Sequence, residues 1–316
     1  MSAQTLRLGF IPLNDCAPLV VARERGFFAA EGLDVELVRE PSWANIRDKL
    51  AAGAIDGAHM LAPMTLAASL GAGSDPLALI APFALNHNGS AFTVSTALVR
   101  AAKSGELAKL AHARREAGSP LRLAVVFPYS IHSYLLRDWL IGQGVDPERD
   151  VRISVAPPPR MGGQLAEGLI DGFCAGEPWG ALAAAQGLGA VVMRAAELRP
   201  RSPDKVLGVT EAWAEAEPAA LRAMIRALSG ASAWSDAHRP ELAALLSQPD
   251  YVGAPVALIQ SSLNGMAFAP AGRPDPEDAV WLLEQMARWG QIEPQPDLAA
   301  VAARVYRPDL YEAALG

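Results

Sequence analysis

The chain has 316 residues, of which 51% are hydrophobic and 19% charged, and its formal net charge is −7. This length predicts two domains with a substantial core, and the acidic balance argues against a nucleic-acid surface, which requires a basic face. Two cysteines, Cys16 and Cys174, argue against a disulfide scaffold or a familiar zinc motif, so free thiols are expected.

The N-terminal stretch MSAQTLRLGFIP has no basic start, no long apolar run and no small-residue cleavage site. The first strand is expected to begin at Leu6, which leaves no room for a removed leader. No run approaches about 18 uninterrupted apolar residues, so no membrane span is expected. These features predict a protein that works in the cytoplasm.

The chain repeats one pattern in its two halves. The stretches KLAAGAIDGAHML (Lys49–Leu61) and QLAEGLIDGFCAG (Gln164–Gly176) share Leu-Ala-x-Gly-x-Ile-Asp-Gly. Upstream of them, LRLGFIP begins at Leu6 and LRLAVVFP at Leu121, which is the same offset of 115 positions. In each half the order of patterns is strand, helix, strand, helix, strand.

This alternation predicts an α/β fold of two similar lobes, each with parallel strands covered by helices. Ligands of such sheets bind beyond the carboxyl ends of the strands, so a cleft between facing lobes is expected. The first lobe is expected to comprise residues 1–95 plus about 210–316, and the second about 96–209.

The remaining segments read as helices and crossovers. Helices are expected over Glu215–His238 with an interruption near Pro218, over Pro240–Ser247 and over Pro274–Gly290. The proline-rich segments Ala156–Pro159 and Arg199–Pro203 are typical of loops or lobe crossovers.

A catalytic signature is not apparent. The sequence lacks GxSxG, HExxH, a phosphate loop and GxGxxG, and its five histidines are scattered without ligand spacing. No catalytic residue, metal or cofactor is therefore predicted. An enzyme stays open at this point, because catalytic triads need no local spacing.

Polar or aromatic side chains follow several predicted strands. Trp43 comes between a strand and a helix, His132 lies just before a helix start, Gly176 follows a short strand, and Lys205 precedes a strand-like run. Each also has an ordinary reading: a packing aromatic, a helix cap, a tight turn and a solvated lysine. Together they favour a small, planar, anionic ligand, because a buried anion needs charge and hydrogen-bond donors.

The motifs SWANIRDKL, NHNGSAFTVS, FPYSIHSYLLRDWL, DGFCAGEPWG, DKVLGV and DAVWLLEQMARWG resemble the nitrate/bicarbonate-binding family of ABC-transporter solute-binding proteins. The resemblance runs from Leu6 to the RPDLY near the C-terminus. It implies a two-lobed periplasmic-binding-protein-like (type II) fold with a ligand cleft between the lobes.

The resemblance also implies a nitrate site formed by a tryptophan, a glutamine, a histidine, a glycine and a lysine. Four of these correspond to Trp43, His132, Gly176 and Lys205, whereas the glutamine position falls on or beside Ser90. A hydroxyl reaches less far than an amide, so a water or Asn88 is expected to compensate, with Glu177 as a further supporting residue. The choice between nitrate and nitrite stays open.

Within the family, a member without a leader resembles the cytoplasmic nitrate/nitrite sensors of the NasS type. Such sensors hold an RNA-binding antiterminator of the NasT type and release it when the ion binds. Two alternatives stay open: a transporter component for nitrate, bicarbonate or another small anion, and a biosynthetic enzyme on the same fold.

Overall fold

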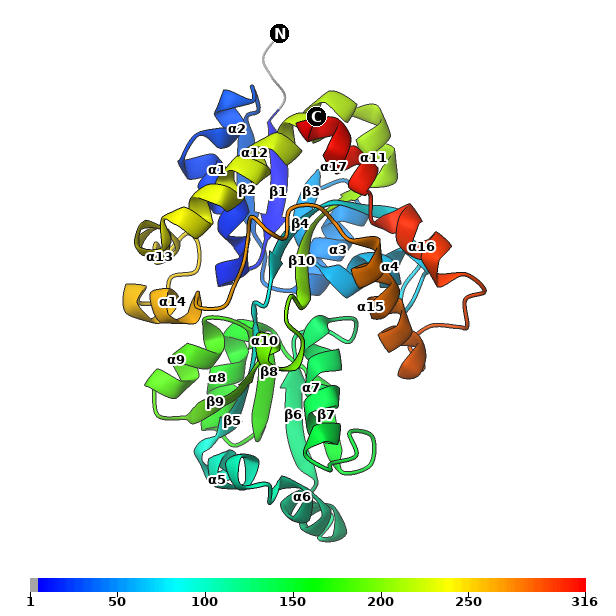
Figure 1. The fold of residues 1–316 in the computed structure, drawn as a ribbon. Helices are drawn as coiled ribbons and strands as arrows, with labels where there is room; N and C mark the ends of the chain where they lie inside the picture. The colour runs from blue at the N-terminus through cyan, green and yellow to red at the C-terminus, as the bar shows by residue number, and fades with distance from the viewer. Residues whose placement is uncertain (1–4) are drawn as a thin grey trace.

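The two halves of the repeat fold into two lobes, each built on a five-stranded sheet (Figure 1). The computed structural model describes residues 5–316. The strands of the first sheet are β1 (Leu6–Phe10), β2 (Val35–Arg39), β3 (Gly57–Leu61), β4 (Leu79–His87) and β10 (Pro203–Thr210). Those of the second are β5 (Ser90–Ser95), β6 (Leu121–Val125), β7 (Val151–Val155), β8 (Gly172–Gly176) and β9 (Gly189–Arg194).

The two sheets have the same topology. Their orders are β2-β1-β3-β10-β4 and β7-β6-β8-β5-β9. In each, the fourth strand, β10 or β5, is antiparallel to both of its neighbours, and the other four strands run in one direction. The predicted α/β class and the β-α-β-α-β unit are confirmed, but each sheet is mixed rather than wholly parallel.

At the antiparallel strands β5 and β10 the chain passes from one lobe to the other, so each of these strands belongs to the sheet of the opposite lobe. β5 follows β4 of the first sheet yet pairs with β8 in the second, and β10 returns from the second lobe to pair with β3. The chain therefore crosses between lobes at residues 88–89 and 199–202. The limits expected from the sequence, 95 and about 209, each lie one strand later, because the internal repeat does not include the exchanged strands.

The repeated Ile-Asp-Gly motif fastens the start of the third strand to the first strand of its lobe. Asp56 Oδ2 accepts the Arg7 backbone N–H at 2.7 Å, and Asp171 Oδ2 accepts that of Arg122 at 2.8 Å. Both carboxylates thus satisfy a backbone donor near the start of an interior strand, and such a donor is otherwise costly to leave unpaired. The Ile-Asp-Gly motif therefore occurs in both halves of the chain because each lobe needs the same contact between its first and third strands.

The helices of the first lobe are α1 (Ala17–Glu24), α2 (Phe27–Ala30), α3 (Trp43–Ala51), α4 (Ala62–Ser69), α11 (Glu211–Ala216), α12 (Pro218–Ala237), α13 (Arg239–Leu246), α14 (Val256–Ser262), α15 (Pro276–Arg288), α16 (Leu298–Val305) and α17 (Pro308–Leu315), with a short 3-10 turn, η1, at Asn14–Cys16. Those of the second lobe are α5 (Thr96–Ser104), α6 (Leu107–Glu116), α7 (Ile131–Gly142), α8 (Pro158–Ala166), α9 (Trp179–Ala185) and α10 (Ala195–Leu198).

The predicted C-terminal helices are found within a few residues of their expected limits. The break near Pro218 separates α11 from α12, where proline begins the second helix. The pattern that follows β1 was expected to form one helix, but it forms α1 and α2, because Gly26 adopts a positive φ of 76° between them. Arg199–Pro203 is a lobe crossover as predicted, whereas Pro158 already begins α8.

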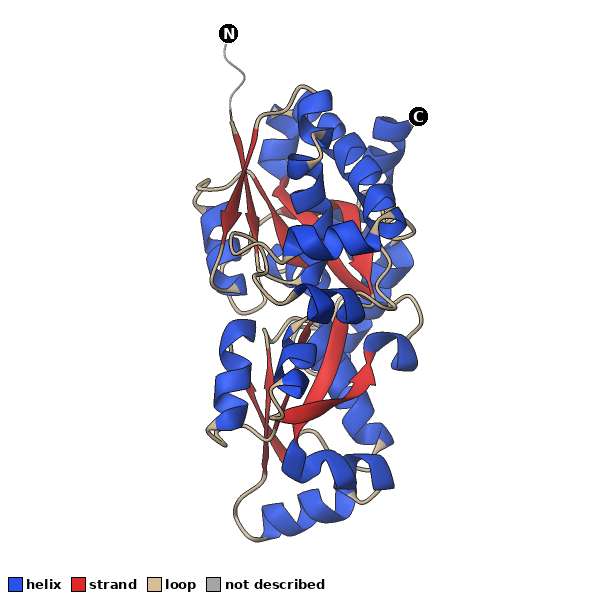
Figure 2. Ribbon diagram, turned by 90° about the vertical axis from the view of Figure 1, so that its left-hand side faces the viewer, coloured by secondary structure: helices blue, strands red, loops and turns tan. Residues whose placement is uncertain are grey.

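Helices cover both faces of each sheet (Figure 2). The chain moves from β1 outward to β2 and then back across to β3, and right-handed crossovers of opposite direction place α1 and α3 on opposite faces. One buried core accordingly lies under α1 and α12, and a second continues through α3 and α4 into the other lobe. In the described residues, no helix combines the length and apolar character needed to cross a membrane.

Candidate functional site

The carboxyl ends of the strands bring the candidate residues to the junction of the lobes. The first lobe provides Trp43 at the start of α3 and Lys205 within β10; the second provides His132 in the first turn of α7 and Gly176 at the end of β8. This is the edge at which α/β sheets bind ligands. Two placements differ slightly from expectation, because α7 already begins at Ile131 and β10 already begins at Pro203.

Serine caps hold Trp43 and His132 in place. Ser42 Oγ accepts the Asn45 backbone N–H at 3.3 Å at the start of α3, and Ser130 Oγ accepts that of Ser133 at 3.2 Å at the start of α7. Such caps satisfy one of the free donors at a helix start and fix where the first turn begins. Both side chains are therefore positioned by the first turn of a capped helix.

Lys205 is fully buried between two carboxylates. Its Nζ lies 2.8 Å from Asp15 Oδ2 and donates to Asp204 Oδ1. Burial by itself lowers the pKa of Lys205, but the charges of Asp15 and Asp204 outweigh burial and raise it above its ordinary value. The lysine is therefore a permanent cation, and it is already paired within the protein.

Asp15 links this ion pair to His59. The His59 Nε2 lies 2.8 Å from Asp15 Oδ1, while Nδ1 of the same ring accepts the Ile11 backbone N–H at 3.4 Å. Burial alone would raise the pKa of Asp15, but the charge of Lys205 and the contact with the His59 ring outweigh burial and lower the pKa to about 2. Asp15 is therefore a buried anion at neutral pH.

Trp43 and His132 contribute buried polar atoms without partners. The Trp43 ring lies 5.7 Å from Lys205 Nζ and 5.2 Å from the His59 ring, and only 1% of the residue is exposed. Its Nε1 and both ring nitrogens of His132 have no hydrogen-bond partner. Buried polar groups are almost always paired, so these atoms require an explanation.

Burial lowers the pKa of His132 well below its ordinary value, and the charge of Lys205 lowers it further, while Asp15 acts in the opposite direction. The imidazole is therefore neutral at pH 7. Its place in the first turn of α7 puts the ring at the junction of the lobes, where the Lys205–Asp15 pair also lies. We call Lys205 and its neighbours the Lys205 cluster: Asp15, Trp43, His59, His132, Asp204 and Lys205.

Glycines allow the second lobe to approach this cluster closely. A Cβ atom on Gly176 would lie 3.2 Å from Asp15 Oδ2 and 3.2 Å from the Leu13 side chain. A Cβ on Gly89, in the crossover, would overlap the Asp204 carboxylate. Gly176 thus lies against the cluster, and a side chain there would require Asp15 and Leu13 to shift.

Three other predicted residues take different positions. Ser90 Oγ donates to Asp204 Oδ2 at 3.4 Å, so it borders the cluster from the second lobe. Asn88 instead ties the two crossovers together, because its Oδ1 accepts the Ser202 backbone N–H at 2.8 Å. Glu177 directs its carboxylate to Arg194 Nη1 at 3.1 Å, and its backbone carbonyl accepts the Asn14 N–H at 2.8 Å across the lobes.

The ligand roles of the five expected residues stay a prediction, but their convergence is observed. Sequence reasoning missed Asp15, His59 and Asp204, although each left a signal. Asp15 follows β1 and corresponds by the 115-residue offset to Ser130, the cap of α7; His59 lies within the repeated stretch, and Asp204 precedes Lys205. In residues 5–316 no group of three or more acidic, histidine or cysteine side chains is arranged to hold a metal ion.

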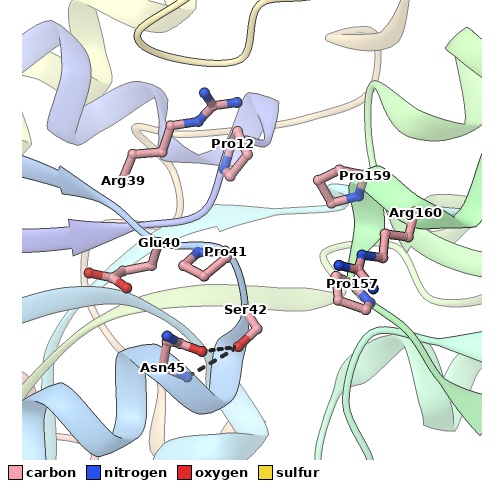
Figure 3. A pocket seen from close by; sticks show the side chains of 9 residues that line it. All are labelled: Pro12, Arg39, Glu40, Pro41, Ser42, Asn45, Pro157, Pro159 and Arg160. Carbon is pink, nitrogen blue, oxygen red and sulfur yellow. Dashed lines mark hydrogen bonds between the residues drawn. The ribbon is translucent and has the colours of Figure 1, made fainter.

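An open cavity of about 480 Å³ lies between the lobes beside the start of α3. Figure 3 shows residues of the first lobe on one side of it and residues of the second lobe on the other. The lining residues are Pro12, Arg39, Glu40, Pro41, Ser42 and Asn45 facing Pro157, Pro159 and Arg160. The cavity does not include the Lys205 cluster, whose charged members are buried beyond it.

Comparison with known proteins gives a consistent set of similarities. The model of the NMT1-like family matches residues 2–248. The nitrate/nitrite binding protein NrtA of Synechococcus elongatus is 32% identical, with 97% of this chain and 76% of that protein covered. The crystal structure of the periplasmic nitrate-binding protein NrtA from Synechocystis has a TM-score of 0.91 at 28% identity, covering 99% of this chain and 88% of that one.

Higher identities occur in longer proteins. The nitrate import ATP-binding protein NrtC of Synechocystis sp. is 38% identical over 97% of this chain, and the bicarbonate transport ATP-binding protein CmpC of Synechococcus elongatus is 37% identical over 98%. The chain spans about half the length of these relatives, 49% of each. The similarity therefore concerns one part of those proteins.

Proposed function

Because the chain belongs to the NMT1-like family, we propose that it binds a small planar oxyanion, nitrate or nitrite, between its two lobes. Its similarity to NrtA nitrate-binding proteins along nearly the whole chain supports this proposal. The observation that carries it is the set of fully buried, unpartnered polar atoms of Trp43 and His132, with the Trp43 ring 5.7 Å from Nζ of the buried Lys205. An oxyanion supplies the acceptors that these donors lack.

The bound ion would contact both lobes. The Trp43 Nε1–H and a ring nitrogen of His132 donate hydrogen bonds to it, Lys205 supplies the positive charge, and Gly176 allows the backbone to come close. Hydrogen bonds to a charged partner contribute roughly 1.5–3 kcal/mol each, so three of them support micromolar binding after the costs of association. Ser90 stands where the amide of a glutamine would reach further, and it borders the site through Asp204.

The lobes must separate before the ion can enter. Trp43, His132 and Lys205 are each at most 1% exposed in this form. A ligand that contacts residues of both lobes favours the closed form by the difference between its affinities for the closed and open forms. Ligand binding thereby increases the population of the closed form at the expense of the open form. A partner protein that binds only one of the two forms responds to this change.

The role that we infer for this change is that of a cytoplasmic sensor in nitrate assimilation. In this proposal the ion-free protein holds an RNA-binding antiterminator of the NasT type and releases it when nitrate or nitrite binds. The motif resemblance supports it, and the net charge of −7 suits a basic partner. A mixture with such an antiterminator should elute as a complex in gel filtration, and nitrate should dissociate it; a complex that ignores nitrate would contradict the sensor role.

A solute-binding component of a transporter is the second candidate. It is favoured by the similarity to NrtA and by the 37% identity to a bicarbonate transport protein. Export of the protein from its native cell, tested by fractionation, would favour this candidate over the sensor. A biosynthetic enzyme for large substrates is less well supported, because the members of the Lys205 cluster are at most 1% exposed.

Isothermal titration calorimetry with nitrate and with nitrite tests the binding proposal directly. We expect one site per chain with a micromolar dissociation constant for at least one of the two ions. Chloride at the same ionic strength is the control, because it has the charge without the planar set of acceptors. Absence of both heat and thermal stabilisation with nitrate and with nitrite would end the proposal.

A further inference from the structure

The Lys205 cluster carries more negative than positive charge before any ion enters. Asp15 and Asp204 both contact the single ammonium of Lys205. His59 is neutral, because its Nδ1 accepts the Ile11 N–H and only Nε2, which faces Asp15, carries a proton. His132 is neutral as well, because its ring is fully buried and burial disfavours its charged form. The sum is one net negative charge.

Neighbouring charges do not correct this excess. The Glu177 carboxylate pairs with Arg194 at 3.1 Å and accepts the Ala181 N–H at 3.0 Å, and the Glu40 carboxylate pairs with Lys49 at 2.6 Å. Each of these acids is neutralised by its own partner. The excess negative charge of the Lys205 cluster therefore has to be compensated by a group within the site.

An anion that joins this cluster meets Asp15. Nitrate and nitrite have acceptor oxygens only, and a carboxylate is likewise an acceptor, so they repel each other in a buried site where charges interact strongly. A proton between them removes the repulsion. His132 can hold that proton, because its two nitrogens have no partner and both the ion and Asp15 would stabilise an imidazolium.

We propose that Asp15 makes the site between the lobes selective for an oxyanion accompanied by one proton. The inference rests on the proposed binding of a small oxyanion at this place. An acceptor-only ion binds as His132 takes up a proton from solvent. An oxyanion with its own O–H, such as hydrogen carbonate, brings the proton with it and donates it in a hydrogen bond to Asp15.

Proton uptake can be measured by titrating nitrate at pH 8 in buffers of different ionisation enthalpy. We expect uptake of close to one proton per bound nitrate and a dissociation constant that rises about tenfold from pH 7 to pH 8, as linkage to one proton requires. In Asp15→Asn the uptake should fall towards zero, the pH dependence should flatten, and nitrate should bind more tightly at pH 8. Asp75→Asn, an exposed carboxylate, is the matched control and should behave like the wild type.

The outcomes separate this inference from the binding proposal. Nitrate binding without proton uptake and without pH dependence would overturn the role of Asp15 and leave nitrate binding intact. Binding of hydrogen carbonate but not nitrate would support Asp15 and end the proposed ligand. If the wild type bound neither, a gain of nitrate binding in Asp15→Asn would support the inference and no gain would overturn it. If the Asp15→Asn variant does not fold, the same measurements are made on Asp204→Asn, which removes the other carboxylate of the cluster.

Discussion

The pairing of Lys205 with two carboxylates changes what its removal would mean. A variant without the ammonium leaves Asp15 and Asp204 buried and uncompensated, and breaking a buried ion pair in this way typically costs about 3–5 kcal/mol of stability. Loss of ligand binding in such a variant would therefore mix a folding defect with a missing contact. His132 offers a cleaner test at the residue scale, because it is buried without a hydrogen-bond partner.

His132 predicts a pH dependence of stability in the ion-free protein. Its folded pKa lies well below 6.5, so below pH 6.5 the unfolded chain binds a proton that the folded chain does not. The stability is complete above pH 6.5 and is lost as the pH falls towards the folded pKa, by roughly 1 kcal/mol at pH 5.5. Urea unfolding at pH 7.5 and 5.5 should show this loss in the wild type.

His132→Gln should lose correspondingly less stability over the same interval, because glutamine does not titrate. His238→Gln, outside the Lys205 cluster and stacked on Trp234, is the matched control and should keep the wild-type loss. An equal loss in His132→Gln and the wild type would show that other groups cause the acid sensitivity, and that His132 is not held neutral by burial.

At the scale of elements, most of the correctly predicted strands and helices followed from the internal repeat of the sequence. Short contacts along the chain, such as a glycine after a helix or an aspartate before a strand, leave local signals, and Gly53 and Gly168 indeed have φ of +64° and +65° after α3 and α8. The exchange of β5 and β10 leaves no such signal, because strand pairing depends on contacts far apart in sequence. The contact of Asp15 with Lys205 was missed for the same reason, whereas Asp204 was missed although it precedes Lys205 directly in the sequence.

Two glycines near the end of one helix should respond to alanine in opposite directions. Gly168 lies beyond α8 at positive φ, where an alanine side chain costs about 1–2 kcal/mol. Gly163 lies inside α8 with open space where a Cβ would be, so alanine there should stabilise by about 0.5–1 kcal/mol. Thermal or urea unfolding of Gly168→Ala and Gly163→Ala checks both signs. Equal effects would mean that α8 does not end as the repeat predicts.

On the scale of the whole molecule, the two lobes are held in a closed form by contacts on both sides of the Lys205 cluster. On one side Trp179 Nε1 donates to the Pro12 carbonyl at 3.2 Å. On the other, Gln291 follows α15 of the first lobe and contacts the second. Its Oε1 accepts from Tyr134 Oη at 2.8 Å, and its Nε2 donates to the Pro128 carbonyl at 3.1 Å.

We therefore expect Gln291 to act on ligand affinity without belonging to the site. Tyr134 lies in α7, the helix that carries His132, so closure of the lobes and completion of the site involve the same element. Sequence reasoning could not predict this contact, since Gln291 and Tyr134 are 157 positions apart. If these hydrogen bonds exist only in the closed form, removing them shifts the population towards the open form and lowers the apparent affinity.

Gln291→Ala should weaken nitrate binding about tenfold, because two hydrogen bonds of about 0.5–1.5 kcal/mol each are lost from the closed form alone. It should also enlarge the radius of gyration of the ion-free protein in X-ray scattering. Gln295→Ala is the matched control, since the Gln295 side chain donates only to the nearby Glu293 carbonyl. If Gln291→Ala leaves both the affinity and the radius at wild-type values, the closed form does not depend on this contact, and other contacts between the lobes, such as those from Trp179 Nε1 to the Pro12 carbonyl and from the Asn14 N–H to the Glu177 carbonyl, must hold it.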